Sequence, residues 1–126
     1  MTTSKKATIV YAEDSKSIST IVKAKLSSEG YEVHHFENGE GVVDAVVKYK
    51  PTAVVLDNDM PVKDGFTILQ EIKKIPEVEN IPIIFLTNKK DSQSVMNCLQ
   101  FGVSDYIVKD PLAISTIISR IKRYIQ

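Results

Sequence analysis

The chain has 126 residues, of which 43% are hydrophobic and 25% are charged, as in an ordinary globular protein. Sixteen basic residues balance sixteen acidic ones, so no overall field draws the chain to nucleic acid or to an anionic membrane surface. The single cysteine excludes an internal disulfide, and no apolar stretch is long enough to span a bilayer. We therefore expect one cytoplasmic domain over residues 1–126, with residues 1–6 as an N-terminal tail.

Apolar runs alternate with amphipathic stretches along the whole chain. The run at residues 31–36 alternates between polar and apolar side chains, which predicts an edge strand with one solvent-exposed face. The other runs are nearly continuous hydrophobics, typical of strands that are covered on both faces. The five predicted strands are residues 7–12, 31–36, 53–57, 82–87 and 105–108.

Between these runs, apolar residues recur at helical spacing. The first stretch ends at Gly30, a plausible residue just beyond a helix C-terminus, and the last begins after Asp110 as N-cap and Pro111 as first helical residue. Five β-α units predict an α/β domain, a doubly wound parallel sheet with right-handed crossovers and helices on both faces. The helices are marked by residues 18–26, 43–47, 66–73, 95–99 and 114–125.

Polar side chains stand at or directly after the ends of four predicted strands. In a parallel sheet these ends lie at the same edge, which is where ligands bind in doubly wound folds. Carboxylates gathered there repel one another unless a cation lies among them. The residues are Glu13 and Asp14 after the first run, Asp57 and Asp59 at the third, Thr87 at the fourth and Lys109 after the fifth.

Oxygen ligands of this kind suit Mg²⁺, which needs one or two carboxylates together with waters and a phosphate. Zinc is not expected, because His34 and His35 lie in a different strand, one on each side, and Cys98 lies within a helix. Lys109 adds a positive charge and Thr87 a hydroxyl donor, which together favour a ligand with several negative oxygens such as a phosphoryl group. Asp57 at the centre is then available as a carboxylate nucleophile.

The chain resembles the receiver domain of bacterial response regulators from about residue 6 to its end. The resemblance implies a flavodoxin-like (βα)5 fold with strand order 2-1-3-4-5, acting as a phosphoacceptor in two-component or phosphorelay signalling. The motifs that carry it, in chain order, are Glu13-Asp14, Val55-Leu56-Asp57 with Met60-Pro61 and Asp64-Gly65, Leu86-Thr87, and Asp105-Tyr106-Ile107-Val108-Lys109.

The same resemblance implies a role for each site residue. Asp57 takes a phosphoryl group from a histidine kinase or a histidine phosphotransfer protein. Mg²⁺ is held directly by Asp14 and Asp57, by the backbone carbonyl of Asp59, and through a coordinated water by Glu13. Lys109 pairs with the phosphoryl oxygens.

The implied output is a conformational switch rather than turnover of a separate substrate. Thr87 binds a phosphoryl oxygen, and Tyr106 occupies the aromatic switch position, moving inward as Thr87 shifts; Tyr106 is equally well read as a buried strand aromatic. The only chemistry expected is self-phosphotransfer and slow autodephosphorylation at Asp57. The signal then passes by protein contact through the fourth helix, the strand of Tyr106 and the fifth helix, to a target that the sequence does not identify, with no direct contact to nucleic acid or membrane.

Three features depart from the family pattern. Receivers usually place a proline after the lysine, but here Asp110 follows Lys109, and we expect that peptide bond to be trans. Asn88 is larger than the usual neighbour of the threonine and narrows access to Asp57. Asp59 and Lys89 flank the expected phosphoryl position, and we hypothesise that they pair across it and slow hydrolysis.

Other readings of the same residues stay open at this point. Taken alone, Asp14 fits an N-cap of the first helix better than a metal ligand. The Asp57-x-Asp59 pattern also resembles phosphatases of the haloacid dehalogenase type, although their nucleophile lies near the N-terminus. A pseudo-receiver, which binds partners without being phosphorylated, is the remaining alternative, because Asn88 and Asp110 depart from the usual pattern.

Overall fold

The computed structural model describes residues 7–88, 92–109 and 114–125, and ten alternating strands and helices occupy these segments. All ten lie where the sequence predicts them. The strands are β1 (Thr8–Ala12), β2 (Glu32–Phe36), β3 (Ala53–Asp57), β4 (Ile83–Thr87) and β5 (Asp105–Val108). The helices are α1 (Lys16–Ser28), α2 (Val42–Tyr49), α3 (Gly65–Lys73), α4 (Ser92–Gln100) and α5 (Ile114–Ile125).

Some expectations fall on residues outside the described segments. These concern the tail at residues 1–6, the side chain of Lys89, the Lys109–Asp110 peptide bond, and the helix start at Asp110 and Pro111. They stay predictions.

The five strands form one parallel sheet in the order β2-β1-β3-β4-β5, which confirms the order that the family resemblance implies. The register places Ala12 opposite Leu56, Asp57 opposite Leu86 and Thr87 opposite Val108. The chain passes from β2 across β1 to β3, so the strand order reverses beside β1. Residues that follow β1, β3, β4 and β5 are therefore brought to one edge of the sheet.

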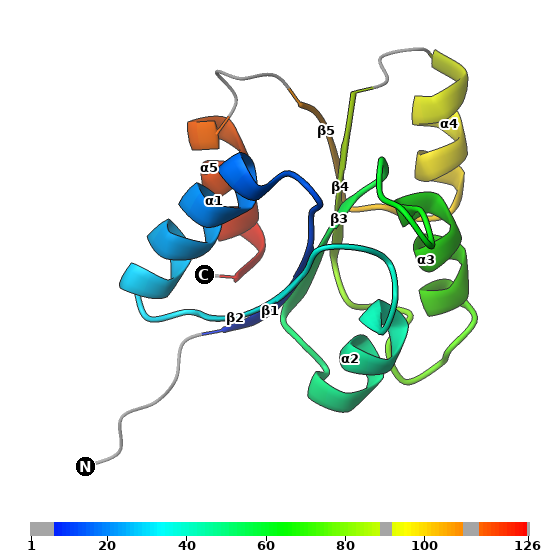
Figure 1. Ribbon diagram of the computed structural model, residues 1–126. Helices are drawn as coiled ribbons and strands as arrows, with labels where there is room; N and C mark the ends of the chain where they lie inside the picture. The colour runs from blue at the N-terminus through cyan, green and yellow to red at the C-terminus, as the bar shows by residue number, and fades with distance from the viewer. Residues whose placement is uncertain (1–6, 89–91, 110–113, 126) are drawn as a thin grey trace.

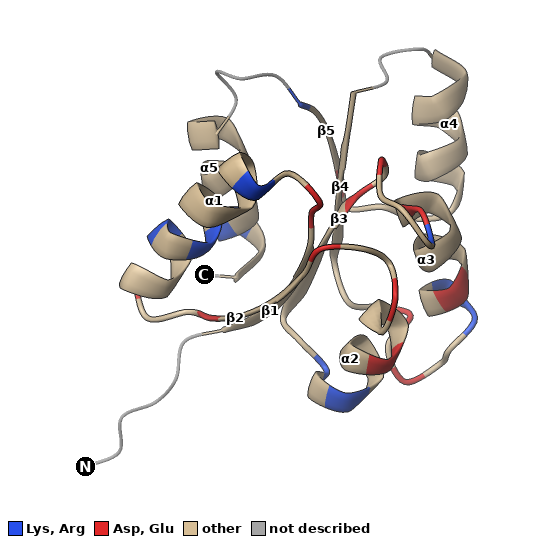
Figure 2. Cartoon of the chain, in the orientation of Figure 1, with Lys and Arg blue, Asp and Glu red and all other residues tan. Residues whose placement is uncertain are grey.

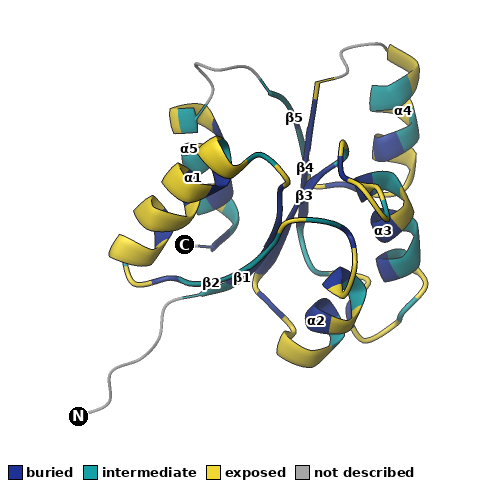
Figure 3. Ribbon diagram, in the orientation of Figure 1, coloured by how far each residue is buried: buried dark blue, intermediate teal, exposed yellow. Residues whose placement is uncertain are grey.

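Helices cover both faces of the sheet, as a doubly wound fold requires. Figure 1 shows α1 and α5 on one face and α2, α3 and α4 on the other. Strands β3 and β4 are buried along their whole length (Figure 3), which explains why their sequences are continuous runs of β-branched and aliphatic residues.

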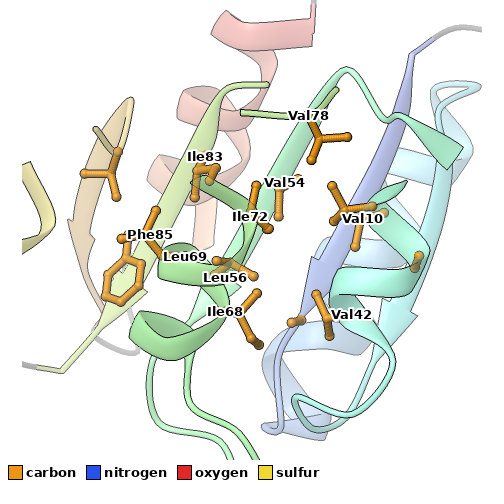
Figure 4. Close-up of a cluster of buried hydrophobic side chains, with 14 of the residues drawn as sticks. Val10, Val42, Val54, Leu56, Ile68, Leu69, Ile72, Val78, Ile83 and Phe85 are labelled. Carbon is orange, nitrogen blue, oxygen red and sulfur yellow. The ribbon is translucent and has the colours of Figure 1, made fainter. Parts of the chain in front are cut away.

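Two apolar clusters fasten the helices to the sheet. On one face, Ile68, Leu69 and Ile72 of α3 pack against Val54 and Leu56 of β3 (Figure 4). On the other face, α1 and α5 contribute a matching set that meets β1, β3 and β4; its helical members are Val22, Leu26, Ile117 and Ile121. Each fully buried aliphatic side chain contributes about 1.5–3 kcal/mol. The strand ends that carry the polar residues are therefore anchored on a rigid base.

Side chains other than Asp14 cap the starts of helices α1 and α3. Ser15 is the N-cap of α1, where its Oγ accepts a hydrogen bond from the Ile18 amide at 3.4 Å. Asp64 caps α3 by accepting from the Thr67 amide at 2.8 Å. The alternative that Asp14 serves as the cap is therefore wrong, and its carboxylate is available for another role.

Strand β2 lies at the sheet edge as predicted, but the prediction of one solvent-exposed face is wrong. All five of its residues are half-buried. The ring of His34 stacks on Tyr49 of α2 with centroids 3.8 Å apart, and the ring of His35 lies 5.5 Å from that of Tyr11. Tyr49 of α2 thus covers the His34 side of this edge strand, and on the other side the His35 ring lies beside Tyr11 of the neighbouring strand.

Helix α4 forms as predicted, yet part of its apolar surface is exposed. Cys98 is the buried residue of this helix, whereas Leu99 and Met96 are each 53% exposed. Phe101, just beyond the helix, is 38% exposed and meets Phe66 edge-on. Among the described helices, none combines the length and apolarity needed to cross a membrane.

Candidate functional site

Three carboxylates gather where the sequence predicts them to meet. Glu13 and Asp14 follow β1 and Asp57 ends β3; each offers an oxygen, and these oxygens lie within 4.8 Å of one another. Figure 2 shows acidic segments at the ends of β1 and β3 and a basic segment at the end of β5. The parallel register brings these segments together although they are far apart in the sequence.

Lys109 completes the cluster from the end of β5. Its Nζ lies 3.0 Å from Glu13 Oε2 and 3.0 Å from Asp57 Oδ2. Its backbone amide donates to the Thr87 carbonyl at 2.8 Å, which holds the lysine at the sheet edge. The Glu13 and Asp57 side chains are fully buried and that of Lys109 is 8% exposed, so these charges interact with little screening by water.

The loop after β3 presents Asp57 in a fixed orientation. The Asp59 amide donates to Asp57 Oδ1 at 3.1 Å, and Asn58 Oδ1 accepts from the Phe66 amide at 3.0 Å. A Cβ on Gly65 would lie 2.7 Å from the Asp57 carbonyl oxygen and 2.9 Å from Asn58 Cα. Only glycine lets α3 begin this close to the aspartate, which explains the Asp64-Gly65 motif.

The pKa values of the cluster reflect burial and crowded negative charge. The pKa of Asp57 is raised to about 7, first by burial and then by the adjacent Glu13 carboxylate, while Lys109 opposes the rise. Burial and the proximity of Asp57 likewise raise the pKa of Asp14. Burial alone would lower the pKa of Lys109, but the hydrogen bond to Glu13 and the charge of Asp57 raise it, so the lysine stays cationic. One lysine against three carboxylates leaves the cluster short of positive charge.

The cluster fits a hard divalent cation. All three ligand candidates offer oxygen, the donor type that such cations prefer. Glu13 Oε2 accepts from both Lys109 and the Ser15 amide, whereas Glu13 Oε1 is buried without a hydrogen-bond partner in the described protein. A buried, unpaired carboxylate oxygen is costly, and a cation or its water would satisfy it.

An open groove of about 600 Å³ leads to this cluster. Asn88 and Asp59 line it from opposite loops and are hydrogen-bonded: the Asn88 backbone amide and Nδ2 lie 3.4 Å and 3.3 Å from Asp59 Oδ2. The expected partner of Asp59, Lys89, lies outside the described residues. The contact between Asp59 and Asn88 was not predicted from the sequence. The rest of the lining consists of Asp14, Ser15, Ser17, Ile18, Ile21, Lys109 and Ile114.

Thr87 and Tyr106 lie on the side of the sheet that α3 and α4 cover. Thr87 is the last residue of β4 and is 1% exposed. Both residues line a cavity of about 200 Å³ between the sheet and helices α3 and α4, and Cys98 is part of its wall. Tyr106 is half-buried, and its ring lies 6.0 Å from that of Phe85.

Two residues next to the cluster were not predicted. The Nε2 of His35, a residue considered above only as an unlikely zinc ligand, lies 3.0 Å from the Glu13 carbonyl oxygen, and because a carbonyl only accepts, this nitrogen carries the proton. Tyr11 was read only as part of an apolar run, yet it is fully buried two residues before Glu13. The signal that could have revealed it is the two-residue period of a strand, which puts Tyr11 and Glu13 on the same side.

Comparison with known proteins assigns the chain to a protein family. Residues 9–122 match the sequence profile of the response regulator receiver domain. The chain belongs to this receiver domain family. Receiver domains are the phosphorylated modules of two-component systems, and the cluster of Glu13, Asp14 and Asp57 fits the phosphoacceptor site of such a domain.

Solved receiver domains have the same fold. One is the receiver domain of a sensor histidine kinase from Pseudomonas aeruginosa PAO1, with a magnesium ion coordinated in its active-site cleft; it is 30% identical, with a TM-score of 0.81 over 97% of this chain and 98% of that one. The receiver domain of a histidine kinase from Syntrophus aciditrophicus is also 30% identical, with a TM-score of 0.81 over 94% and 89%. The BeF3-activated receiver domain of Klebsiella pneumoniae RstA is 26% identical, with a TM-score of 0.79 over 94% and 98%.

Proposed function

We propose that this receiver domain spans residues 1–126 and accepts a phosphoryl group on Asp57 from a histidine kinase or a histidine phosphotransfer protein. The observation that carries the proposal is the buried Asp57 carboxylate, oriented by the Asp59 amide and held by Lys109, at the centre of an acidic cluster. A carboxylate in this setting is a nucleophile positioned at the sheet edge, beside the groove through which a donor protein would approach.

In the proposed reaction, an oxygen of Asp57 attacks the phosphorus of a phosphohistidine. The O–P bond forms while the P–N bond breaks, and the bonding electron pair stays with the imidazole of the donor. The transferred group adds negative oxygens beside Lys109, whose Nζ already lies 3.0 Å from Asp57 Oδ2 and can neutralise them. The Thr87 hydroxyl donates to one phosphoryl oxygen.

We propose Mg²⁺ as the cation of this cluster. Asp14 and Asp57 would bind it directly, the Asp59 backbone carbonyl would be a further ligand, and Glu13 would act through a coordinated water. When bound, the ion neutralises the charge that accumulates on the phosphoryl oxygens. The raised pKa of Asp57, about 7, supports this proposal, because a nearby cation favours the ionised carboxylate that the reaction requires.

The proposed output runs from Thr87 to Tyr106. Both side chains line the same cavity, so a shift of Thr87 toward the phosphoryl group would open space into which the Tyr106 ring can turn. This changes the surface formed by α4, β5 and α5, which would bind a downstream protein in one state of the switch. Asp59 and Asn88, which meet at the mouth of the site, would tune the phosphoryl lifetime together with Lys89.

The match of the receiver profile to residues 9–122 disfavours the phosphatase alternative. The pseudo-receiver alternative is disfavoured by the presence of acceptor, acidic residues and lysine in one contact network. The family relationship supports the view that chemistry is limited to self-phosphotransfer and slow loss of the phosphoryl group.

The test is phosphorylation with acetyl phosphate and with a phosphorylated histidine donor, in the presence of Mg²⁺ or of a chelator. We expect a stoichiometric, acid-stable and base-labile phosphoprotein that forms only with Mg²⁺ and is lost in Asp57→Asn. Asp44→Asn, an acidic residue of α2 outside the cluster, is the matched control and should label normally. Labelling of Asp57→Asn at the wild-type rate, or rapid turnover of a phosphate ester, would contradict the proposal.

A further inference from the structure

Tyr11 presents a hydroxyl that the fold buries without satisfying. The residue lies in β1, is fully buried, and packs within the apolar cluster under α1 and α5. Its Oη has no hydrogen-bond partner within the described protein. Since buried hydroxyls are nearly always paired, this one calls for a partner, either a neighbouring carboxylate or a water that bridges to it.

The second unpaired buried side-chain atom of the described residues lies two positions further along the chain. Glu13 Oε1 has no partner, although Glu13 Oε2 accepts from both Lys109 and Ser15. The Glu13 amide donates to the Phe36 carbonyl at 2.9 Å and so continues the pairing of β1 with β2. Tyr11 and Glu13 are therefore successive residues on one side of the same extended segment.

His35 joins the two residues from the neighbouring strand. Its ring lies 5.5 Å from the Tyr11 ring, and its Nε2 donates to the Glu13 carbonyl at 3.0 Å. The backbone of Glu13 is thereby fixed, while one oxygen of its carboxylate has nothing to hold it. One unpaired donor and one unpaired acceptor thus belong to residues two positions apart on the same side of one extended segment, and both residues contact His35.

The chemistry of the two groups says which of them donates. A phenol hydroxyl carries a proton that it can donate, whereas an ionised carboxylate only accepts. The Tyr11 hydroxyl can therefore support the Glu13 carboxylate only as a donor.

We propose that Tyr11 is a positioning residue of the metal and phosphoryl site: its hydroxyl donates a hydrogen bond, directly or through one water, to Glu13 Oε1 and fixes that carboxylate when a cation binds. This inference rests on the proposed function of the cluster. In this proposal, a core residue of β1 supports the acidic site from below the residues that contact the ion. Outer hydrogen bonds of this kind orient ligands and raise metal affinity.

The experiment compares Tyr11→Phe with the wild type and with Tyr124→Phe. The Tyr124 hydroxyl donates to the Ser104 carbonyl at 2.9 Å, and Ser104 precedes β5 at the opposite end of that strand from Lys109, so this control removes a paired hydroxyl away from the acidic cluster. Each protein is titrated with Mg²⁺ by calorimetry, and its melting temperature is measured with a chelator and with saturating Mg²⁺. The rate of phosphorylation by acetyl phosphate is measured in parallel.

For Tyr11→Phe we expect the Mg²⁺ dissociation constant to rise roughly tenfold and the Mg²⁺-induced rise in melting temperature to shrink. Without metal, its melting temperature should equal or exceed that of the wild type, because an unpaired buried hydroxyl has been removed. Tyr124→Phe should melt at a lower temperature without metal and bind Mg²⁺ normally. A purely structural role for Tyr11 would give the Tyr124→Phe pattern instead.

Unchanged Mg²⁺ affinity in Tyr11→Phe would overturn the role of Tyr11 and leave the proposed function intact. Equal loss of affinity in both variants would also overturn it, because the effect would then be general. If the wild type itself neither binds Mg²⁺ nor becomes phosphorylated, the proposed function fails and the inference fails with it. The wild-type measurement therefore separates the two failures.

Discussion

The Nζ of Lys109 lies 3.0 Å from Asp57 Oδ2, although the two residues are 52 positions apart in the sequence and end different strands. The same nitrogen lies 3.0 Å from Glu13 Oε2. A nearly buried lysine therefore holds two fully buried carboxylates. Any ligand that enters this cluster has to share these carboxylates with Lys109 or replace it.

Replacing Lys109 by methionine tests this relationship. The substitution keeps the length of the side chain but leaves two buried carboxylates without their cation, so the free energy of unfolding should fall by about 3 kcal/mol near neutral pH. The pKa of Asp57 should rise further, because Lys109 is what opposes its increase. Urea denaturation in a chelator measures the first effect, and the pH dependence of labelling by acetyl phosphate measures the second.

Lys48→Met serves as the control, because Lys48 lies in α2 away from the cluster and contacts the Tyr49 ring. It should leave the pH dependence of labelling unchanged. A Lys109→Met protein as stable as the wild type would show that the buried ion pairs do not hold the cluster together.

The raised pKa of Asp57 predicts an unusual pH dependence of stability. Asp57 titrates at about 7 in the folded protein, whereas an unfolded chain loses that proton near pH 4. Between these values the folded state binds more protons, so in a chelator the free energy of unfolding should fall as the pH rises from about 4 to about 7, and level off above. Denaturation curves across this range should show the decline in the wild type and a much flatter profile in Asp57→Asn.

Mg²⁺ should act in the opposite direction. Its ligands must be ionised, so its stabilising effect should grow from about pH 5 to about pH 8. Equal stabilisation at both pH values would argue that the ion binds elsewhere.

Gly65→Ala tests how closely α3 must approach the acceptor. The new Cβ would lie 2.7 Å from the Asp57 carbonyl oxygen, so the backbone at Asp57 has to move, and we expect a loss of roughly 1–3 kcal/mol in stability. Phosphorylation should slow as well, because Asp57 itself is displaced. Gly102→Ala also introduces strain, at a φ of +84°, but beyond α4 and away from the cluster. It should lower stability without slowing phosphorylation, and similar phosphorylation rates in both variants would contradict the prediction.

The contact between Asn88 and Asp59 predicts an effect on the phosphoryl lifetime. Asn88→Ala removes the Nδ2 contact to Asp59 Oδ2 and widens the groove. Since an exposed hydrogen bond contributes about 0.5 kcal/mol or slightly more, loss of the phosphoryl group and labelling by acetyl phosphate should both accelerate by about twofold to fivefold. Asn38→Ala removes an amide side chain that bonds to Glu40 in the β2–α2 loop and should change neither rate. A slower loss of the phosphoryl group in Asn88→Ala would disprove the gating role.

Val62 is held in an unfavourable backbone conformation, and relieving it should stabilise the protein. Its φ is +71°, a region that β-branched residues rarely adopt, and its side chain is 75% exposed. Val62→Asn should therefore raise the free energy of unfolding by roughly 1 kcal/mol, because asparagine tolerates this conformation. Val62→Ala, which removes both γ-methyl groups but gains none of asparagine's tolerance for this conformation, should gain less. A less stable Val62→Asn protein would mean that the valine side chain makes contacts that outweigh the strain.

The strands and the acidic cluster could be predicted because both follow from strong, local signals. Burial on two faces requires continuous apolar runs such as residues 53–57, and parallel pairing then brings Asp14, Asp57 and Lys109 to one edge whatever their separation in sequence. Side-chain contacts between loops could not be predicted in this way. The bond from Asn88 to Asp59 depends on the rotamers and backbone of two separate turns, which no periodicity encodes.

The burial of the edge strand β2 could not be predicted from the sequence pattern either. Whether β2 has an open face depends on how far His34 and Tyr49 reach over it, and that is decided by packing between β2 and α2. The unpaired hydroxyl of Tyr11 looks like any other aromatic in an apolar run until its neighbours are placed.

Helix α4 has a consequence for how a signal can leave this protein. Since Cys98 is its buried side chain, little apolar area would be lost if the helix rolled or slid over the sheet. Its free-energy cost of displacement is therefore lower than that of α3 or α5, each of which buries at least three residues. Amide hydrogens of α4 should exchange with deuterium sooner than those of the other helices. This helix would then have the lowest local stability of the segments next to the phosphorylation site.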